Sequence, residues 1–287
     1  MKGKKVALLG ATGFLGKQML FDLVSHGYLV TVILRNDKKN SAGFSVRTLS
    51  LEQFLSSQEE FEFIINCAGY YTKSTQFQDI FKIRKSNYVL IKKLIKFRER
   101  NGGVLVTFGS YFERRPSWKN MPASYYTKYK LEAKKKLKIS AENISSPTFY
   151  IYLFDTYGDD DNRNKVLTFI IKEFKAGIIP ILTTSSESIN WSHIADITAS
   201  IIKLLHNSKK YSAYRLHEFQ IRSIDEFRLA DFVNMISRKI NFNESSYEKN
   251  SNSNKLFDCA PNLKYFEARY NVIDFTLKTI QRKDSIE

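Results

Sequence analysis

The sequence is poor in cysteine, proline and histidine. Of its 287 residues, two are cysteine, five are proline and four are histidine. Cys67 and Cys259 lie far apart and have no partners at metal-ligand spacing, so neither a disulfide framework nor a metal site is expected. The first apolar run stops at a glycine-rich turn that begins at Gly10, which argues against a signal peptide or a membrane span. We therefore expect a reduced, cytoplasmic protein.

Acidic residues are also few in relation to basic ones. The chain has 29 Asp and Glu against 45 Lys and Arg, a formal net charge of +16. Such a charge suits a nucleic-acid binder, a membrane-surface protein or an enzyme with anionic substrates. The basic residues are scattered rather than gathered in one arm, so charge alone does not choose among these classes. With 43% hydrophobic and 14% aromatic residues, the chain is expected to fold.

The first thirty-five residues read as strand, glycine turn, helix and strand. In "VALLGATGFLGKQML", Gly10, Gly13 and Gly16 follow an apolar run and open a helical stretch. Glycines at this spacing let the backbone turn sharply and approach a pyrophosphate, which the helix N-terminus favours. This context predicts a dinucleotide-binding turn. The alternative is a tight strand–helix turn without a ligand.

The end of the second strand, "YLVTVIL", bears on which dinucleotide is bound. Sites that prefer NAD place an acidic residue there, against the ribose hydroxyls. This position reads Leu34, Arg35, Asn36. A guanidinium can hold a 2′-phosphate that a carboxylate would repel. The sequence therefore predicts NADP(H) with Arg35 as the main contact, and the alternative is an exposed loop arginine.

Strand-like runs alternate with helical ones along most of the chain. Further apolar runs, "FEFIINCAG", "GGVLVTFGS" and "PTFYIYLFDTYG", are separated by amphipathic stretches. This alternation predicts an α/β fold, a Rossmann-type doubly wound parallel sheet. We expect residues 1–155 and 179–206 to form the dinucleotide-binding domain. Residues 156–178 and 207–287 are expected to form a smaller C-terminal substrate lobe.

One tyrosine in the lysine-rich run "SYYTKYKLEAKKKLK" has a lysine four residues later. Tyr126 and Lys130 share a helix face, and a fixed ammonium can stabilise a phenolate and lower the pKa of the phenol. The pair can then serve as a general acid. The alternative is that the pair is only a surface contact. We expect Lys134, on the same helix, to be solvated surface. His193 is expected to be a packed or capping residue.

These motifs together resemble the extended short-chain dehydrogenase/reductase family of nucleotide-sugar epimerases, dehydratases and reductases. The resemblance rests on "GATGFLG", "NCAG", Asn87, "VTFGS", Tyr126-x-x-x-Lys130, "YG" and Asp196, in the family's order. "FDTYGDDDNRNK" and "GSYF" look most like reductases that make CDP-linked dideoxyhexoses. Tyr111 and Phe112 stand where the dehydratases carry an acidic pair, so dehydration is not expected.

The resemblance implies NADPH-dependent reduction of a keto group, at C4 of a nucleotide-linked deoxy sugar, for surface polysaccharide. Two alternatives stay open: an epimerase that retains NAD, and a regulatory protein that binds NADPH without turnover. A homodimer and no specific nucleic-acid partner are expected.

The implied site residues fall into three overlapping groups. The catalytic residues are Ser110, Tyr126 and Lys130. The cofactor-binding residues are Gly10, Thr12, Gly13, Phe14, Leu15, Gly16, Arg35, Ala68, Tyr126 and Lys130. The substrate-binding residues are Ser110, Tyr111, Asp155, Arg163 and Lys165.

Two positions depart from the family's pattern. Asp159 follows "YG", where proline is frequent, and Ile189 stands where many members carry an arginine that meets the substrate phosphates. Phosphate recognition is therefore expected to come from elsewhere, with Arg163 and Lys165 as candidates. We expect the carboxylates of "DDDNR" (159–163) to cap the following helix rather than to hold a metal.

Overall fold

The computed structural model describes residues 3–35, 46–114, 124–182, 188–223, 225–240, 265–267 and 269–282. The chain divides into two compact units. Unit 1 comprises Met1–Leu153, Thr198–Gln220 and Asn262–Phe266, and unit 2 comprises Phe154–Ile197, Ile221–Pro261 and Glu267–Glu287. Each unit is described by itself.

Unit 1 is built on a sheet whose strand order is β12-β10-β6-β5-β4-β1-β2-β3. Neighbouring strands from β3 to β6 all pair in parallel. The strands span β1 (Lys5–Leu9), β2 (Leu29–Leu34), β3 (Arg47–Ser50), β4 (Phe63–Asn66), β5 (Val104–Ser110), β6 (Thr148–Leu153), β10 (Leu216–Arg222) and β12 (Tyr265–Glu267). The central strands are buried and consist largely of Val, Ile, Leu and Phe, as a sheet covered on both faces requires.

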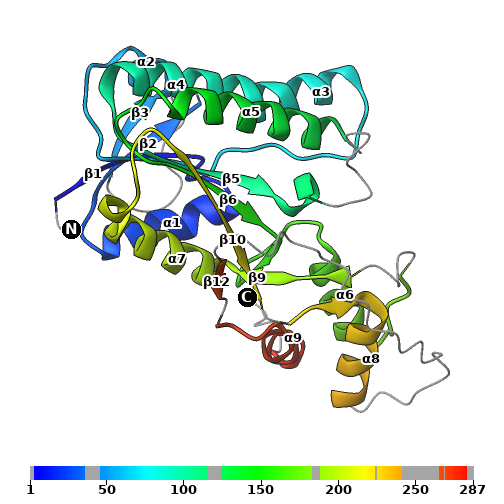
Figure 1. Cartoon of the computed structure of the whole chain (residues 1–287). Coiled ribbons are helices and arrows are strands. Elements are labelled where there is room, and N and C mark those ends of the chain that lie inside the picture. Colours follow the sequence, from blue (N-terminus) through cyan, green and yellow to red (C-terminus); the bar gives the residue numbers. More distant parts are fainter. Residues whose placement is uncertain are drawn as a thin grey trace. The chain divides into compact units, whose positions relative to one another are not determined.

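Helices cover both faces of this sheet (Figure 1). One face carries α1 (Phe14–Ser25) and α7 (Ile194–His206). The other carries α2 (Leu51–Ser56), α3 (Phe77–Arg84), α4 (Leu90–Asn101) and α5 (Tyr125–Ala141). The doubly wound fold is thereby confirmed. The strand order reverses between β1 and β4, and the crevice at such a point is where these folds bind ligands.

Unit 2 is smaller and has its own apolar core. Its helices are α6 (Val166–Lys175), α8 (Leu229–Lys239) and α9 (Val272–Gln281), and its strands are β7 (Asp155–Tyr157), β8 (Ser188–Ile189), β9 (Trp191–His193) and β11 (Phe227–Arg228). Trp191 packs on Phe232 with ring centroids 4.7 Å apart. Ile170 and Ile236 are fully buried beside them.

The two largest differences between the observed division of the chain and the predicted one are the following. We expected residues 179–197 in the dinucleotide-binding domain, but β8 pairs with β11 and β9 pairs with β7, which places both strands in unit 2. We expected residues 207–220 in the lobe, but β10 extends the main sheet beside β6. Both differences arise from strands that pair with partners far away in sequence.

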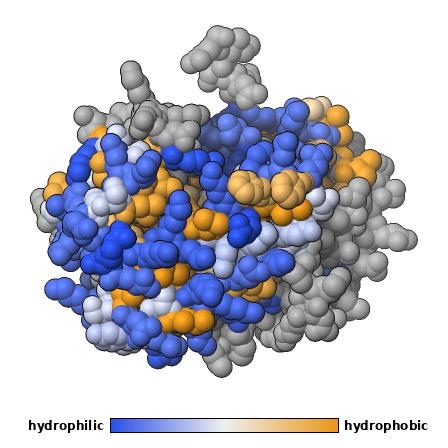
Figure 2. All heavy atoms as spheres, turned by 90° about the horizontal axis from the view of Figure 1, so that it is seen from above, coloured by the Kyte–Doolittle hydropathy of each residue, from blue (hydrophilic) through white to orange (hydrophobic). Residues whose placement is uncertain are grey.

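The face that carries α2 to α5 is mainly hydrophilic, with apolar residues distributed between the polar ones (Figure 2). Among the exposed apolar side chains on α3 are Phe77 and Phe81. In the described part of the chain, no helix combines the length and apolar character needed to cross a bilayer.

Candidate active site

The glycine turn lies at the reversal point of the sheet and joins β1 to α1. Gly10 has φ +78°, and a Cβ there would lie 2.5 Å from the Ala68 nitrogen. A Cβ on Gly16 would overlap the Gly10 carbonyl oxygen. Two of the three glycines are therefore required by the fold itself, since backbone occupies the space beside each.

Gly13 differs from the other two glycines. It has ordinary extended angles, with φ −82° and ψ 167°. A Cβ there would meet only the Gly10 oxygen, at 3.4 Å. Gly13 is also the N-cap of α1, which has no side-chain cap and no acidic residue in its first turn. The bare residue and the uncapped helix N-terminus fit a close-approaching phosphate group, so this site suits a dinucleotide.

The other predicted cofactor residues lie around this turn. Thr12 is exposed, and Phe14 and Leu15 form the partly exposed start of α1. Ala68 follows β4. Its backbone contacts that of Gly10 so closely that no side chain fits on Gly10. Arg35 directly follows β2 and is exposed.

A second cluster, in the same unit, brings Ser110, Tyr126 and Lys130 together. Ser110 ends β5 and is 7% exposed, and its hydroxyl hydrogen-bonds the Tyr126 phenol. Lys130 is 9% exposed. Its Nζ lies 5.8 Å from the Tyr126 ring centroid and donates to the Phe108 carbonyl at 2.6 Å. The three predicted catalytic residues thus meet at the end of β5.

The local sequence of α5 explains this placement. Ser124 caps the helix by accepting a hydrogen bond from the Thr127 nitrogen at 3.2 Å, so Tyr126 lies in the first turn. The residues of α5 that are buried are Thr127, Lys130, Ala133, Leu137 and Ala141. Lys130 therefore belongs to the helix stripe that packs on the sheet, and the small residues on either side leave room for its stem.

The pKa of Tyr126 is raised, which corrects the expectation that Lys130 lowers it. Burial is the largest cause, followed by the charge of Glu113 and by Tyr71, while the Ser110 hydrogen bond acts in the opposite direction. Burial also lowers the pKa of Lys130, against the opposing effect of Glu113. Desolvation and a nearby carboxylate outweigh the Ser110 hydrogen bond, so Tyr126 is held as the neutral phenol.

Aromatic side chains surround the Tyr126 ring. Tyr71 meets it edge-on at 5.1 Å and stacks on Phe112 at 6.3 Å. Tyr111, predicted to bind substrate, is 8% exposed and stacks on Phe112 at 4.2 Å. Tyr71 was missed from the sequence because nothing in "CAGYYTK" distinguishes it from Tyr70.

Glu113 and Lys134 were also not anticipated as parts of a polar cluster. The Glu113 carboxylate accepts hydrogen bonds from the Ser110 nitrogen at 2.7 Å and from the Tyr150 hydroxyl at 3.0 Å. Lys134 was expected to be solvated surface, but its Nζ donates to the Tyr152 hydroxyl at 2.6 Å. The spacing from Lys130 to Lys134, one helix turn, was the available signal that both face the sheet.

The predicted substrate residues of unit 2 are held by one another. Lys165 Nζ lies 3.8 Å from an Asp155 carboxylate oxygen. Arg163 donates to both carboxylate oxygens of Asp161, at 2.6 and 2.7 Å, and to the side chain and carbonyl of Thr156. A phosphate contact by Arg163 stays a prediction, and it would require the guanidinium to exchange these partners.

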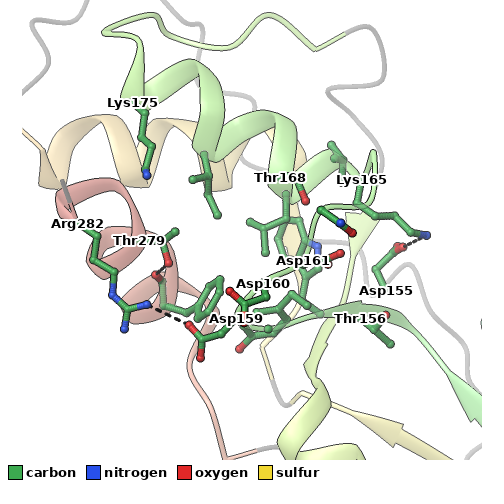
Figure 3. Close-up of a pocket in the computed structure, with 18 residues that line it drawn as sticks. Asp155, Thr156, Asp159, Asp160, Asp161, Lys165, Thr168, Lys175, Thr279 and Arg282 are labelled. Carbon is green, nitrogen blue, oxygen red and sulfur yellow. Dashed lines mark hydrogen bonds and ion pairs between the residues drawn. The ribbon is translucent and has the colours of Figure 1, made fainter. Parts of the chain in front are cut away.

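A cavity of about 900 Å³ lies within unit 2, between α6, α9 and the segment that follows β7 (Figure 3). Its charged lining residues are Asp155, Asp159, Asp160, Asp161, Lys165, Lys175 and Arg282. Thr156, Thr168 and Thr279 add hydroxyls, and Trp191 and Phe275 add aromatic surface. The volume suits a small organic ligand, but four carboxylates against three cations do not by themselves favour a diphosphate.

The two departures from the family's pattern have structural explanations. After Gly158 the chain turns at Asp160, whose φ of +56° is a left-handed conformation that Asp tolerates. Asp159 forms an exposed ion pair with Arg282 at 3.1 Å. Ile189 is 7% exposed and belongs to the core of unit 2, so an arginine there would be buried.

The expected helix cap of "DDDNR" is wrong. Lys165 is the N-cap of α6 and offers no side-chain cap, whereas Asp161 accepts from the Arg163 nitrogen and guanidinium. In the described residues, no group of three His, Cys, Asp or Glu side chains could hold a metal ion.

His193 and Asp196 have structural roles in unit 2. His193 Nδ1 accepts from the Ala195 nitrogen at 3.2 Å, and its ring stacks on Tyr270 at 4.1 Å. This confirms the expectation of a packed, capping histidine. Asp196 accepts from the backbone nitrogens of Arg269 and Tyr270 at 2.8 and 2.9 Å, so it anchors the segment that leads into α9.

A doubly wound sheet with a glycine turn at its reversal point and a Ser–Tyr–Lys cluster defines an enzyme of the extended short-chain dehydrogenase/reductase type. The chain belongs to the NAD dependent epimerase/dehydratase family, whose sequence model matches residues 6–216. It is 25% identical over 242 residues to the CDP-abequose synthase of Salmonella typhimurium, a match that covers 79% of this chain and 78% of that protein.

Solved structures show the same fold. The Bordetella bronchiseptica enzyme WbmF in complex with NAD+ and UDP matches with a TM-score of 0.74 and 17% identity, over 98% of this chain and 92% of that one. The UDP-N-acetylglucosamine 4-epimerase of Bacillus cereus matches with a TM-score of 0.70 and 16% identity, over 97% and 98%.

Proposed function

We propose that the protein reduces a keto group of a nucleotide-linked deoxy sugar, at C4, with NADPH as the reductant. The observation that carries this proposal is the assembly of Ser110, Tyr126 and Lys130 at the end of β5, with Tyr126 held as a neutral phenol. A neutral phenol is the form that donates a proton, which the reduction of a ketone requires. The similarity to CDP-abequose synthase supports the substrate class.

The residues of the chain have the following roles in this reaction. The glycine turn and the N-terminus of α1 would hold the pyrophosphate of the dinucleotide, which would supply the hydride. Ser110 donates a hydrogen bond to the ketone oxygen and orients it. Tyr126 transfers its phenolic proton to that oxygen as negative charge develops there, which leaves an alcohol on the sugar and a phenolate on the enzyme. The nearby Lys130 ammonium stabilises the phenolate until a proton returns from solvent.

The choice of NADPH over NADH rests on Arg35. Its exposed position directly after β2 is where the ribose of the adenosine is recognised in this fold. A guanidinium there can bind a 2′-phosphate through two hydrogen bonds.

The alternative is an epimerase that retains its dinucleotide and returns the hydride to the sugar. Such an enzyme needs Tyr126 as a base in the first half of its cycle and as an acid in the second, whereas the reductase needs it only as an acid. Because the Bacillus cereus 4-epimerase has a similar fold, the experiment below also tests this alternative.

The decisive experiment incubates the purified protein with NADPH and a panel of nucleotide-linked 4-keto-6-deoxy sugars and follows the loss of NADPH absorbance. We expect stoichiometric NADPH consumption with one substrate class and a slower reaction with NADH. Interconversion of two sugars without net consumption would identify the epimerase instead. Turnover with no member of the panel would contradict the substrate assignment.

A further inference from the structure

A carboxylate lies directly behind Ser110 on the side of the sheet that carries α5. Glu113 belongs to the 3-10 turn at Tyr111–Arg114, three residues after Ser110. One of its oxygens accepts from the Ser110 nitrogen at 2.7 Å, and both accept from the Tyr150 hydroxyl, at 3.1 and 3.0 Å. The side chain thus connects the end of β5 to the neighbouring strand β6.

The fold makes room for this carboxylate at Gly109. A Cβ on Gly109 would lie 2.9 Å from a Glu113 oxygen and would overlap the Tyr150 ring. Nothing in the backbone requires glycine there, since Gly109 is an ordinary member of β5 without a positive φ. The small residue is therefore explained by the two side chains, Glu113 and Tyr150, that fill the space beside it.

The charges around Glu113 are mostly on α5. The titratable and charged groups that face it are Tyr126, Lys130 and Lys134 from α5, and Tyr150 and Tyr152 from β6. Burial raises the pKa of Glu113, and the charge of Lys130 is the largest effect that lowers it. Conversely, Glu113 raises the pKa of Lys130 against the effect of burial. Each of these two groups stabilises the charged form of the other.

We propose that Glu113 is a positioning residue of this enzyme: its carboxylate fixes Ser110 through the backbone and is the partly buried counter-charge of the Lys130 ammonium beside Tyr126. The inference rests on the proposed function, because Ser110, Tyr126 and Lys130 act there as a unit. A carboxylate at this distance in sequence from the serine is distinct from the adjacent acidic pair of the dehydratases, whose places are taken by Tyr111 and Phe112.

The proposal gives a definite pH dependence. Glu113 carries its charge above its raised pKa, so activity falls as the pH decreases through a value above the ordinary 4.5 of a glutamate. Because Glu113 also raises the pKa values of Lys130 and Tyr126, its removal shifts the alkaline limb of the profile to lower pH. A residue that only stabilises the fold would change neither limb.

The activity test compares Glu113→Gln with Glu218→Gln as the matched control. Glu218 also bonds a tyrosine on β6, Tyr152, and lies 3.5 Å from Lys134, but it contacts no part of the catalytic cluster that the structure describes. We expect Glu113→Gln to lower kcat at neutral pH roughly tenfold, with KM changed less than about twofold. Its acid limb is expected to disappear, whereas Glu218→Gln keeps the parent profile. An unchanged profile in folded Glu113→Gln overturns the proposal.

A second measurement needs no substrate and so separates this proposal from the proposed function. Infrared difference spectra between the parent and Glu113→Gln report the carbonyl band of the protonated Glu113 carboxyl as the pH is lowered. Because Lys130 lowers the pKa of Glu113, Lys130→Met is expected to move the midpoint of this band to higher pH. Lys128→Met, at an exposed position of the same helix, leaves it in place.

The two results have separate meanings. If the parent reduces no nucleotide sugar but the midpoint moves in Lys130→Met, the proposed substrate is wrong and the Glu113–Lys130 pair stands. If the midpoint is the same in the parent and Lys130→Met, the pair is not coupled and the present proposal is wrong, whatever the activity.

Discussion

The predicted residues of unit 1 and those of unit 2 are held in opposite ways. In unit 1, Gly13 leaves open space beside an uncapped helix, and Tyr126 and Ser110 meet at the end of a strand. In unit 2, Arg163 and Lys165 make ion pairs with Asp161 and Asp155. The first arrangement leaves room for a ligand beside a helix N-terminus, whereas in the second the charged side chains already pair with one another. The residues proposed for proton transfer and cofactor binding in unit 1 are therefore better defined than those proposed for substrate recognition in unit 2.

The largest effect is expected from Tyr126→Phe. The change removes the proton donor and keeps the ring, so the edge-on contact with Tyr71 remains. We expect kcat to fall about 10²- to 10⁴-fold, with NADPH affinity nearly unchanged. Tyr152→Phe, which removes a hydroxyl that bonds Lys134 and Glu218, is the control and should retain activity. Steady-state kinetics and NADPH titration check both, and full activity in Tyr126→Phe would contradict the mechanism.

Two glycines of one turn should respond differently to alanine. Gly16→Ala places a methyl group on the Gly10 carbonyl oxygen, and we expect a stability loss of about 3 kcal/mol or more. Gly13→Ala fits its extended backbone, so the gain from a stiffer unfolded chain and the loss of a better N-cap should offset to within about 1 kcal/mol. Its methyl group would occupy the space in which we propose that the phosphate binds.

Denaturant unfolding and dinucleotide titration separate the two effects. Gly13→Ala should unfold like the parent and bind NADPH at least tenfold more weakly, as roughly 1.4 kcal/mol of lost affinity. If Gly13→Ala binds NADPH with parental affinity, the glycine turn is a structural turn only. Unit 1 would then not differ from unit 2 in leaving room for a ligand.

A smaller effect is expected at Arg35. Loss of a charge-assisted contact costs about 1.5–3 kcal/mol, so Arg35→Ala should weaken NADPH binding about tenfold to a hundredfold and leave NADH binding unchanged. The matched control is Arg47→Ala, at an exposed arginine that pairs with Glu59 at 2.8 Å. Equal affinity of the parent for NADPH and NADH would refute the preference for NADP.

Features that depend on residues close together in the sequence could be predicted from it, whereas features that depend on residues far apart could not. The glycine turn and the pair Tyr126–Lys130 depend on neighbours within a few residues, so their spacing, together with the strands that precede them, predicts them from the sequence. Glu113 and Tyr150 are 37 residues apart in sequence, and only the parallel register of β5 and β6 brings them together. The pKa of Tyr126 was predicted in the wrong direction for the same reason, since burial and Glu113 are tertiary effects. The predicted boundaries failed where strands pair over long separations: the two- and three-residue strands β8 and β9, and the seven-residue strand β10.

The smallest effects are expected at Arg163 and Lys165. They test whether these residues of unit 2 are held by their internal partners or bind the substrate. The Arg163 guanidinium makes four hydrogen bonds within its own segment, so Arg163→Ala should lower the free energy of unfolding by about 1–2 kcal/mol. The Lys165–Asp155 pair is long, at 3.8 Å, and partly exposed, so Lys165→Ala should change stability by less than about 1 kcal/mol. If Lys165 contacts the substrate phosphates, this variant raises KM severalfold at constant kcat, because uniform binding is lost. The converse result, in which Arg163→Ala leaves thermal unfolding unchanged and raises KM, would mean that its internal partners are readily exchanged for phosphate and that unit 2 is as ready for a ligand as unit 1.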